Sequence, residues 1–126
     1  MTALLRGRVE SGVGDFGAWI AKLQAHYERK TGMNLYPGTL NVRLSEPYVV
    51  PRGCIRLEGH EYGGSVSVSI IPCRFLGRRA LILRTDANEA GDGRHSRNVL
   101  EIASDVKLRD ECKLADGDEA SIEVDN

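Results

Sequence analysis

The stretch L-R-G-R-V-E-S-G-V-G-D-F-G, residues 5–17, decides between the two folds that this sequence suggests. Its second half fits the pattern G-x-G-x-x-G, which follows a strand and opens a helix in dinucleotide-binding folds. In its first half, Leu5, Gly7 and Val9 alternate with charged side chains, a period of two that predicts a half-exposed strand. Strands of a parallel sheet are covered on both faces and are apolar throughout, so the alternation argues against the dinucleotide fold.

The remaining sequence also favours an antiparallel β fold. Glu46 falls about where a dinucleotide fold places its ribose-binding acid, but no second strand–helix–strand unit follows. Only residues 18–31 show apolar side chains at helical spacing, and Gly32 follows two basic residues as a stop signal. The polar residues 86–93 are expected to form a mobile loop. Strand-like segments with turn signals between them cover residues 40–44, 54–57, 66–71, 80–84, 99–102 and 121–124.

These patterns predict a mainly β domain over residues 1–126, a small barrel or sandwich with one helix. Basic and acidic residues number 17 and 18, so the basic excess that is typical of nucleic-acid or membrane-surface binders is absent. The three cysteines are odd in number and widely spaced, which favours reduced thiols over a disulfide framework or a zinc site. No apolar stretch approaches the ~18 residues of a membrane span. We expect a cytoplasmic monomer that binds small molecules, with no nucleic-acid or membrane partner.

Several residues carry side chains or backbone suited to phosphate chemistry. Closely spaced glycines in residues 12–17 would let backbone N–H groups approach a phosphate, although a ligand-free turn is an equal alternative. Thr39 and Asn41 lie two apart on a predicted strand, so both face one side and could bind Mg²⁺ together with substrate phosphates. Glu101 faces opposite to its apolar neighbours and could orient or deprotonate a hydroxyl, or could be only solvated. Lys107 and Arg109 share a face and could neutralise phosphate charge, or form a solvated basic pair.

Three segments together resemble one known family. They are G-R-V-E-S-G-V-G at residues 7–14, Y-P-G-T-L-N-V-R-L at residues 36–44, and a third region from 95 to 119. The third region contains N-V-L-E-I, K-L-R-D and L-A-D-G-D-E in that order. Their order and spacing resemble the archaeal CTP-dependent riboflavin kinases over nearly the whole chain, and G-T-L-N is the most specific element.

The resemblance implies a six-stranded cradle-loop β-barrel that transfers the γ-phosphoryl group of CTP to the 5′-hydroxyl of riboflavin, giving FMN and CDP. It implies Mg²⁺ as the cofactor, with Thr39 and Asn41 as ligands, and Glu101 and Gly93 as contacts to the flavin substrate. Glu101 would also be the catalytic residue. The residues implied for nucleotide binding are Gly12, Val13, Gly14, Asp15, Phe16, Gly17, Lys107, Leu108, Arg109 and Asp110.

Two positions depart from the family pattern. Gly93 stands where the family typically has a threonine that touches the flavin, and Phe16 stands where a glycine is expected. The alternatives are therefore a kinase acting on a different small alcohol, or a barrel that binds nucleotide or flavin without catalysis. A DNA-binding barrel is a third possibility, suggested by the D-G-D-E turn and disfavoured by the near-zero net charge.

Overall fold

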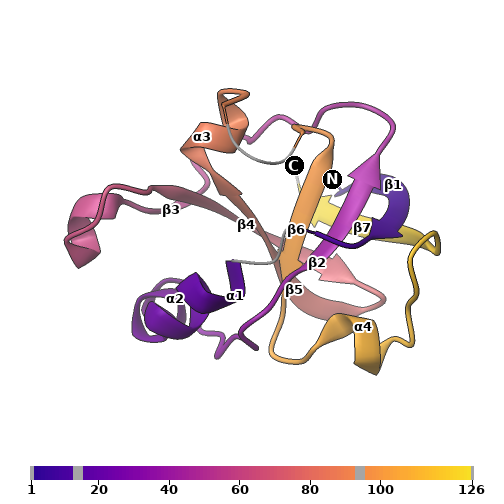
Figure 1. Ribbon diagram of the computed structural model, residues 1–126, viewed down its shortest axis with the longest axis horizontal. Coiled ribbons are helices and arrows are strands. Elements are labelled where there is room, and N and C mark those ends of the chain that lie inside the picture. The colour runs from indigo at the N-terminus through magenta and orange to yellow at the C-terminus, as the bar shows by residue number, and fades with distance from the viewer. Residues whose placement is uncertain (1, 13–15, 93–95, 126) are drawn as a thin grey trace.

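A computed structural model describes residues 2–12, 16–92 and 96–125 of the chain. Within these residues the helices are short and strands form most of the regular structure (Figure 1). The strands are β1 (Thr2–Glu10), β2 (Leu40–Leu44), β3 (Ile55–Leu57), β4 (Val68–Phe75), β5 (Arg78–Thr85), β6 (Val99–Ala103) and β7 (Glu119–Asp125). The helices are α1 (Phe16–Lys22), α2 (Gln24–Thr31), α3 (Asp86–Glu89) and α4 (Leu108–Glu111), with a 3₁₀ turn η1 (Gly59–Tyr62).

The strands close into a barrel, which confirms the predicted fold class. The strand order is β3-β4-β5-β6-β2-β1-β7, and β7 pairs again with β4, so six antiparallel strands form a closed ring. The first half of β4 pairs with β3, up to Ile70, and its second half pairs with β7 from Cys73 onward. Pro72 lies at this changeover. The strand predicted over 66–71 ended too early, because proline disfavours a paired strand. The structure accommodates Pro72 within β4 because it lies where β4 changes its pairing partner from β3 to β7.

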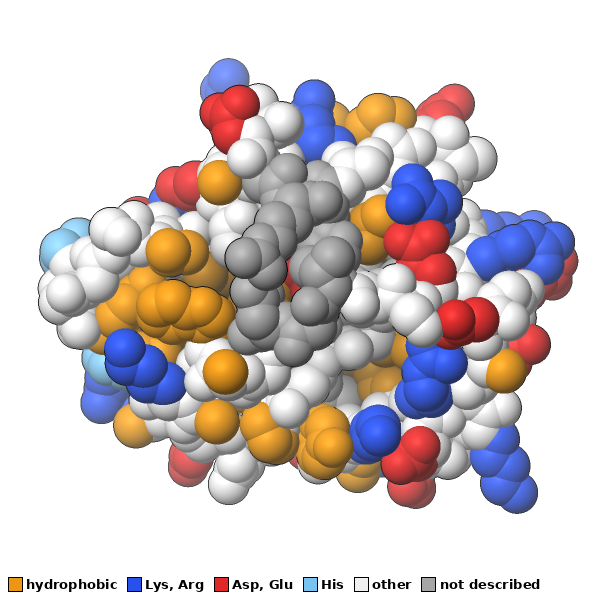
Figure 2. All heavy atoms as spheres, in the orientation of Figure 1, with side chains coloured by type: hydrophobic (Ala, Val, Ile, Leu, Met, Phe, Trp, Pro, Cys, Tyr) orange, Lys and Arg blue, Asp and Glu red, His pale blue; other side chains and the backbone are white. Residues whose placement is uncertain are grey.

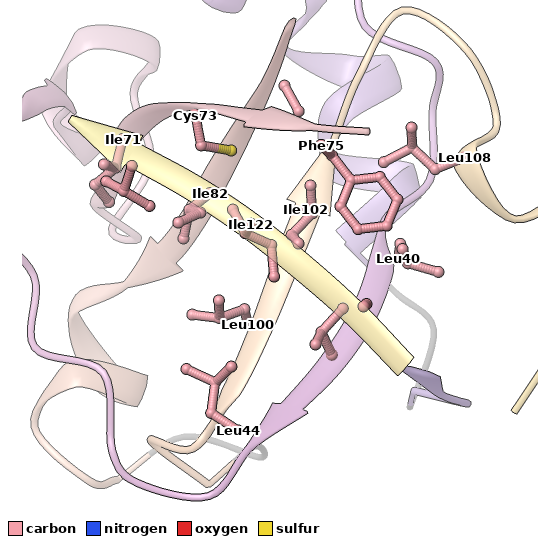
Figure 3. Packing of buried hydrophobic residues seen from close by; sticks show 14 of the residues in the cluster. Leu40, Leu44, Ile71, Cys73, Phe75, Ile82, Leu100, Ile102, Leu108 and Ile122 are labelled. Carbon is pink, nitrogen blue, oxygen red and sulfur yellow. The ribbon is translucent and has the colours of Figure 1, made fainter. Parts of the chain in front are cut away.

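Two apolar clusters lie on opposite faces of the same strands. Figure 3 shows side chains of β2, β4, β5, β6 and β7 converging inside the barrel, among them Leu100, Ile102 and Ile122. The second cluster lies outside the barrel, where α1 and α2 cover the outer faces of β4 and β5. Residues 80–83 are buried on both faces, which explains why this strand is continuously apolar whereas β1 alternates.

The single predicted helix over 18–31 is in fact two helices. Residue Leu23 separates α1 from α2, with φ −107° and ψ 22°. Buried side chains at Ile20, Leu23 and Tyr27 keep helical spacing across the break, so the hydrophobic pattern could not reveal it. The predicted stop is confirmed: Gly32 has φ +74°, and its N–H donates to the carbonyl of Glu28 at 2.8 Å.

The predicted loop over residues 86–93 begins instead with α3. The Thr85 hydroxyl accepts a hydrogen bond from the N–H of Asn88 at 3.1 Å, which caps this one-turn helix. Arg84, which is 2% exposed, donates to Glu89 at 2.8 Å and to the carbonyl of Tyr48 at 2.8 Å. A four-residue helix is too short to show periodicity, so only its capping threonine could have signalled it.

None of the described helices is long and apolar enough to cross a bilayer.

Replacing Gly7 by alanine should destabilise the barrel. A Cβ at this position would lie 2.3 Å from the carbonyl oxygen of Arg43 on β2, and neither backbone can move without disturbing the ladder. We expect Gly7→Ala to lower the free energy of unfolding by about 1–3 kcal/mol in urea denaturation. Arg6→Ala, at an exposed neighbour in the same strand, is the control and should change stability by less than about 0.5 kcal/mol. Equal stability of Gly7→Ala and the wild type would contradict the close approach of β1 and β2.

Candidate functional site

A cleft of about 440 Å³ opens where β1 ends and β2 begins. Three segments that are distant in sequence line it: the two described ends of the glycine loop, residues 37–41, and the start of α4. Most of the predicted site residues within the described chain meet here. They are Gly12, Phe16, Gly17, Thr39, Asn41, Lys107 and Arg109.

The glycines at both ends of the loop allow close backbone approach. A Cβ at Gly12 would lie 2.1 Å from Nδ2 of Asn41, and a Cβ at Gly17 would lie 2.6 Å from the carbonyl oxygen of Pro37. Both ends of the loop therefore pack directly against residues 37–41. The predicted nucleotide-binding residues Val13, Gly14 and Asp15 lie outside the described residues, as does Gly93.

Phe16, the first residue of α1, contributes mainly to packing. Its side chain is 8% exposed and belongs to the apolar cluster beneath the helices, although the residue also borders the cleft. A phenylalanine in place of the expected glycine therefore fixes the start of α1 against the barrel. We infer that any contact of Phe16 with a phosphate comes from its backbone.

Thr39 and Asn41 line the cleft, and both lie next to Glu101, which is not among the residues that line it. In the antiparallel ladder of β2 and β6, Asn41 lies directly opposite Glu101. The hydroxyl of Thr39, just before β2, donates to Oε1 of Glu101 at 3.1 Å. The two side chains of the G-T-L-N element therefore lie on the same side of β2, as the two-residue spacing predicts.

Asn41 offers a cation an oxygen that accepts no hydrogen bond from the described residues. Its side chain is 7% exposed, and Oδ1 is buried without a hydrogen-bond partner among the described residues. Such a buried, unsatisfied oxygen is costly unless a ligand satisfies it. The described residues hold no group of three or more His, Cys, Asp or Glu side chains able to form a metal cage. Thr39 and Asn41 therefore fit a hard cation such as Mg²⁺ only where water and substrate oxygens complete its coordination.

Glu101 is buried rather than solvated. Its neighbours Leu100 and Ile102 point into the barrel, and Glu101 lies on the outer face of β6 at 7% exposure. The alternative of a solvated carboxylate on an exposed strand face is wrong. Burial keeps water away from the carboxylate, which strengthens its hydrogen bonds.

Residues 107–110 do not form the extended segment that the predicted alternation implied. Lys107 precedes the first turn of α4, yet Lys107 and Arg109 both border the cleft. Leu108 is 4% exposed and packs into the barrel core, so its side chain holds the segment in place. The carboxylate of Asp110 faces solvent and lies 3.6 Å from Nζ of Lys107.

Asp116, which sequence reasoning missed, binds two of the residues that line the cleft. Ser11 donates to one oxygen of its carboxylate at 2.7 Å, and Arg109 donates to the other at 2.8 Å. The Arg109 guanidinium also lies 3.5 Å from the carbonyl oxygen of Glu10. These contacts join the start of the glycine loop to α4. The L-A-D-G-D-E turn was the available signal, but a turn pattern alone does not show what its aspartate binds.

The electrostatic field at the cleft comes from nearby charged groups rather than from the net charge of the protein. On the face drawn in Figure 2, the coloured basic and acidic side chains are interspersed rather than gathered by sign. The net charge of −1 agrees with this mixture. Binding of an anion here would therefore depend on donors at short range, and Lys107 and Arg109 are the basic residues among those that line the cleft.

Comparison with known proteins assigns the chain to a family. Residues 9–124 match the family model CTP-dep_RFKase, which is described as "Domain of unknown function DUF120". The chain belongs to this family. It is 33% identical over 97% of its length to a protein of Methanocella arvoryzae named riboflavin kinase, and 31% identical over 95% to one of Pyrobaculum aerophilum with the same name. An Aeropyrum pernix protein of that name is 32% identical over 91% of this chain.

Family members differ in length from this chain. It spans 57% of the Methanocella protein and 60% of the Pyrobaculum protein, but 90% of the Aeropyrum protein. The matched part includes the glycine loop, the G-T-L-N element and α4, because the family model runs from the end of β1 almost to the end of β7. The whole cleft therefore lies within the region shared with the family.

Asp116 should stabilise the fold in a pH-dependent way. The hydrogen bond from Ser11 and then that from Arg109 lower the pKa of its carboxyl group below the ordinary value. A carboxyl group whose pKa is lowered by folding stabilises the protein above the unfolded pKa, and this contribution is lost as the pH falls through the folded pKa. We expect Asp116→Asn to lower the free energy of unfolding near neutral pH, and the difference from the wild type to shrink below about pH 4.

Urea denaturation at several pH values measures this difference. Glu119→Gln is the matched control, because the side-chain contact of Glu119 among the described residues is a highly exposed ion pair with Arg8 at 3.5 Å. A difference between Asp116→Asn and the wild type that stays constant from neutral to acidic pH would exclude the proposed role of the carboxylate.

Proposed function

We propose that this chain is a CTP-dependent riboflavin kinase, which transfers the γ-phosphoryl group of CTP to the 5′-hydroxyl of riboflavin and gives FMN and CDP. The cleft supports this proposal most directly: the described ends of the glycine loop, two side chains suited to bind a cation and two basic side chains meet there, and the buried carboxylate of Glu101 accepts a hydrogen bond from one of them, Thr39. The family membership and the names of the relatives agree with it. We further propose a monomer acting in the cytoplasm on these small molecules.

The nucleotide would lie with its triphosphate between the glycine loop and α4. Backbone N–H groups at the loop would donate to phosphate oxygens, which the glycines allow to come close. Lys107 and Arg109 would neutralise charge on the same oxygens, and Asp116 would hold Arg109 in place for this task. Thr39 and Asn41 would hold Mg²⁺, which when bound offsets the charge of the triphosphate.

Glu101 would act on the acceptor. Its carboxylate would accept a hydrogen bond from the 5′-hydroxyl and fix the direction of the attacking oxygen. A bond forms between this oxygen and the γ-phosphorus while the bond from the γ-phosphorus to the bridging oxygen breaks. CDP leaves, and the hydroxyl proton passes to the carboxylate. Phosphoryl transfer needs mainly positioning and charge neutralisation, and a small barrel can supply both.

The direct test is to incubate the protein with riboflavin, Mg²⁺ and either CTP or ATP, and to follow FMN by chromatography. We expect FMN with CTP and little with ATP. Because Gly93 replaces a threonine typical of the family, other alcohols of similar size should be offered in parallel. Protection by CTP against thermal unfolding without any product would instead indicate a barrel that binds nucleotide without catalysis.

The two proposed cation ligands can be tested by substitution. Thr39→Ala or Asn41→Ala should reduce turnover about 100-fold or more at saturating CTP, since each removes an oxygen near the transferring phosphate. Higher Mg²⁺ concentrations should partly restore the activity of each variant. Asn34→Ala, an exposed asparagine outside the cleft, is the control and should leave turnover unchanged. Wild-type turnover and wild-type Mg²⁺ dependence in Asn41→Ala would remove Asn41 from the site.

A test of the role of Glu101 requires a substitution that keeps the shape of the side chain. Glu101→Gln keeps an acceptor oxygen but cannot take up a proton, so we expect kcat to fall about 100- to 10,000-fold with CTP affinity little changed. Steady-state kinetics and CTP titration by calorimetry measure the two effects separately. Should kcat stay within twofold of the wild type, Glu101 does not participate in the reaction.

A further inference from the structure

Tyr27 on α2 buries a hydroxyl group in an apolar layer. The side chain is 0% exposed and packs in the apolar cluster between the helices and the outer face of the barrel. Its phenol oxygen has no hydrogen-bond partner among the described residues. A phenylalanine would fill the same space without leaving a polar atom unsatisfied in an apolar layer. Packing alone therefore does not account for a tyrosine at this position.

Tyr27 packs against the face of the sheet on which Glu101 lies. The cluster that surrounds Tyr27 includes Leu83 and Ala103. Leu83 lies opposite Glu101 in the ladder of β5 and β6, and Ala103 is the next residue on the same face of β6. Glu101 thus lies on the strand surface that α2 covers, between side chains that pack in the same cluster as the tyrosine ring.

The electrostatics agree with this placement. Burial raises the pKa of the Tyr27 phenol far above its ordinary value, and negative charge on Tyr62 and on Glu101 raises it further. The phenol therefore keeps its proton at any physiological pH and can act only as a neutral donor or acceptor. An ionised carboxylate has about four lone-pair positions, so Glu101 can accept a bond from Tyr27 in addition to the one from Thr39.

Two buried polar atoms without partners among the described residues thus belong to side chains on the same face of the sheet as Glu101: the phenol oxygen of Tyr27, in the cluster that packs on this face, and Oδ1 of Asn41, directly opposite Glu101. Unsatisfied buried groups that cluster in this way are typical of functional sites, where stability is given up for function. We propose that Tyr27 is a positioning residue, whose hydroxyl donates a hydrogen bond to the Glu101 carboxylate when the phosphate acceptor binds. This inference rests on the proposed kinase function and assigns to α2 a role in orienting the group that binds the acceptor.

Tyr27→Phe tests the inference with two readouts. The melting temperature should stay the same or rise, since the variant loses only a hydroxyl without a partner. The kcat for FMN formation should fall about tenfold or more, with the KM for CTP unchanged, because a small misplacement of the carboxylate slows transfer strongly. Tyr48→Phe is the control: Tyr48 is a half-buried tyrosine that packs against the cluster inside the barrel, whereas Glu101 lies on the outer face of β6, so this variant should keep kcat.

A second comparison shows whether Tyr27 acts through Glu101. In a Glu101→Gln background, adding Tyr27→Phe should lower kcat by less than about twofold, because the positioned carboxylate is already absent. An equal loss of kcat in both backgrounds would overturn the inference, as would a clear drop in the melting temperature of Tyr27→Phe alone. A wild type that forms FMN no faster than Tyr27→Phe overturns the inference and leaves the kinase proposal standing. A wild type that forms no FMN with any nucleotide or alcohol removes both.

Discussion

The register of β2 between its two neighbours is the constraint on which the site depends. Val42 lies opposite Val9 of β1 and opposite Leu100 of β6, and all three side chains are buried inside the barrel. A slip of one residue would turn Asn41 into this core and Val42 out of it, at the cost of burying an amide among apolar side chains. The packing of the barrel therefore fixes Asn41 opposite Glu101 without any direct interaction between the two being required.

The sequence predicted the strands well where one face is exposed and less well elsewhere. Alternation in residues 5–10 and 40–44 placed β1 and β2 within a few residues of their observed bounds. The break at Leu23 was not predictable because both helices bury their apolar side chains against the same surface, which preserves the spacing. The short helices α3 and α4 contain a single turn each, and their positions depend on tertiary contacts such as the burial of Leu108.

The residues of the candidate site likewise include some that the sequence could predict and some that it could not. Residues within compact motifs, such as Thr39 and Asn41, could be named because their spacing alone determines that they share a face. Asp116 and Tyr27 could not: Asp116 accepts a hydrogen bond from Ser11, 105 positions away in sequence, and the role proposed for Tyr27 depends on Glu101, which the closed barrel brings to the face that α2 covers. Glu101 was predicted as a site residue, which stays a prediction, but its burial was not predicted, because the covering layer of helices has no signal in the sequence of β6.

The change of partners along β4 has a consequence for how the molecule opens. The ring of six strands closes through the second half of β4, whereas β3 is attached to the first half by three residue pairs. We therefore expect the layer formed by α1, α2, β3 and η1 to open as one unit before the ring does. In amide hydrogen exchange such a layer would exchange through subglobular opening, at lower free energy than the ring. Since α2 belongs to this layer and Glu101 to the ring, breathing of the layer would uncover the carboxylate without unfolding the barrel.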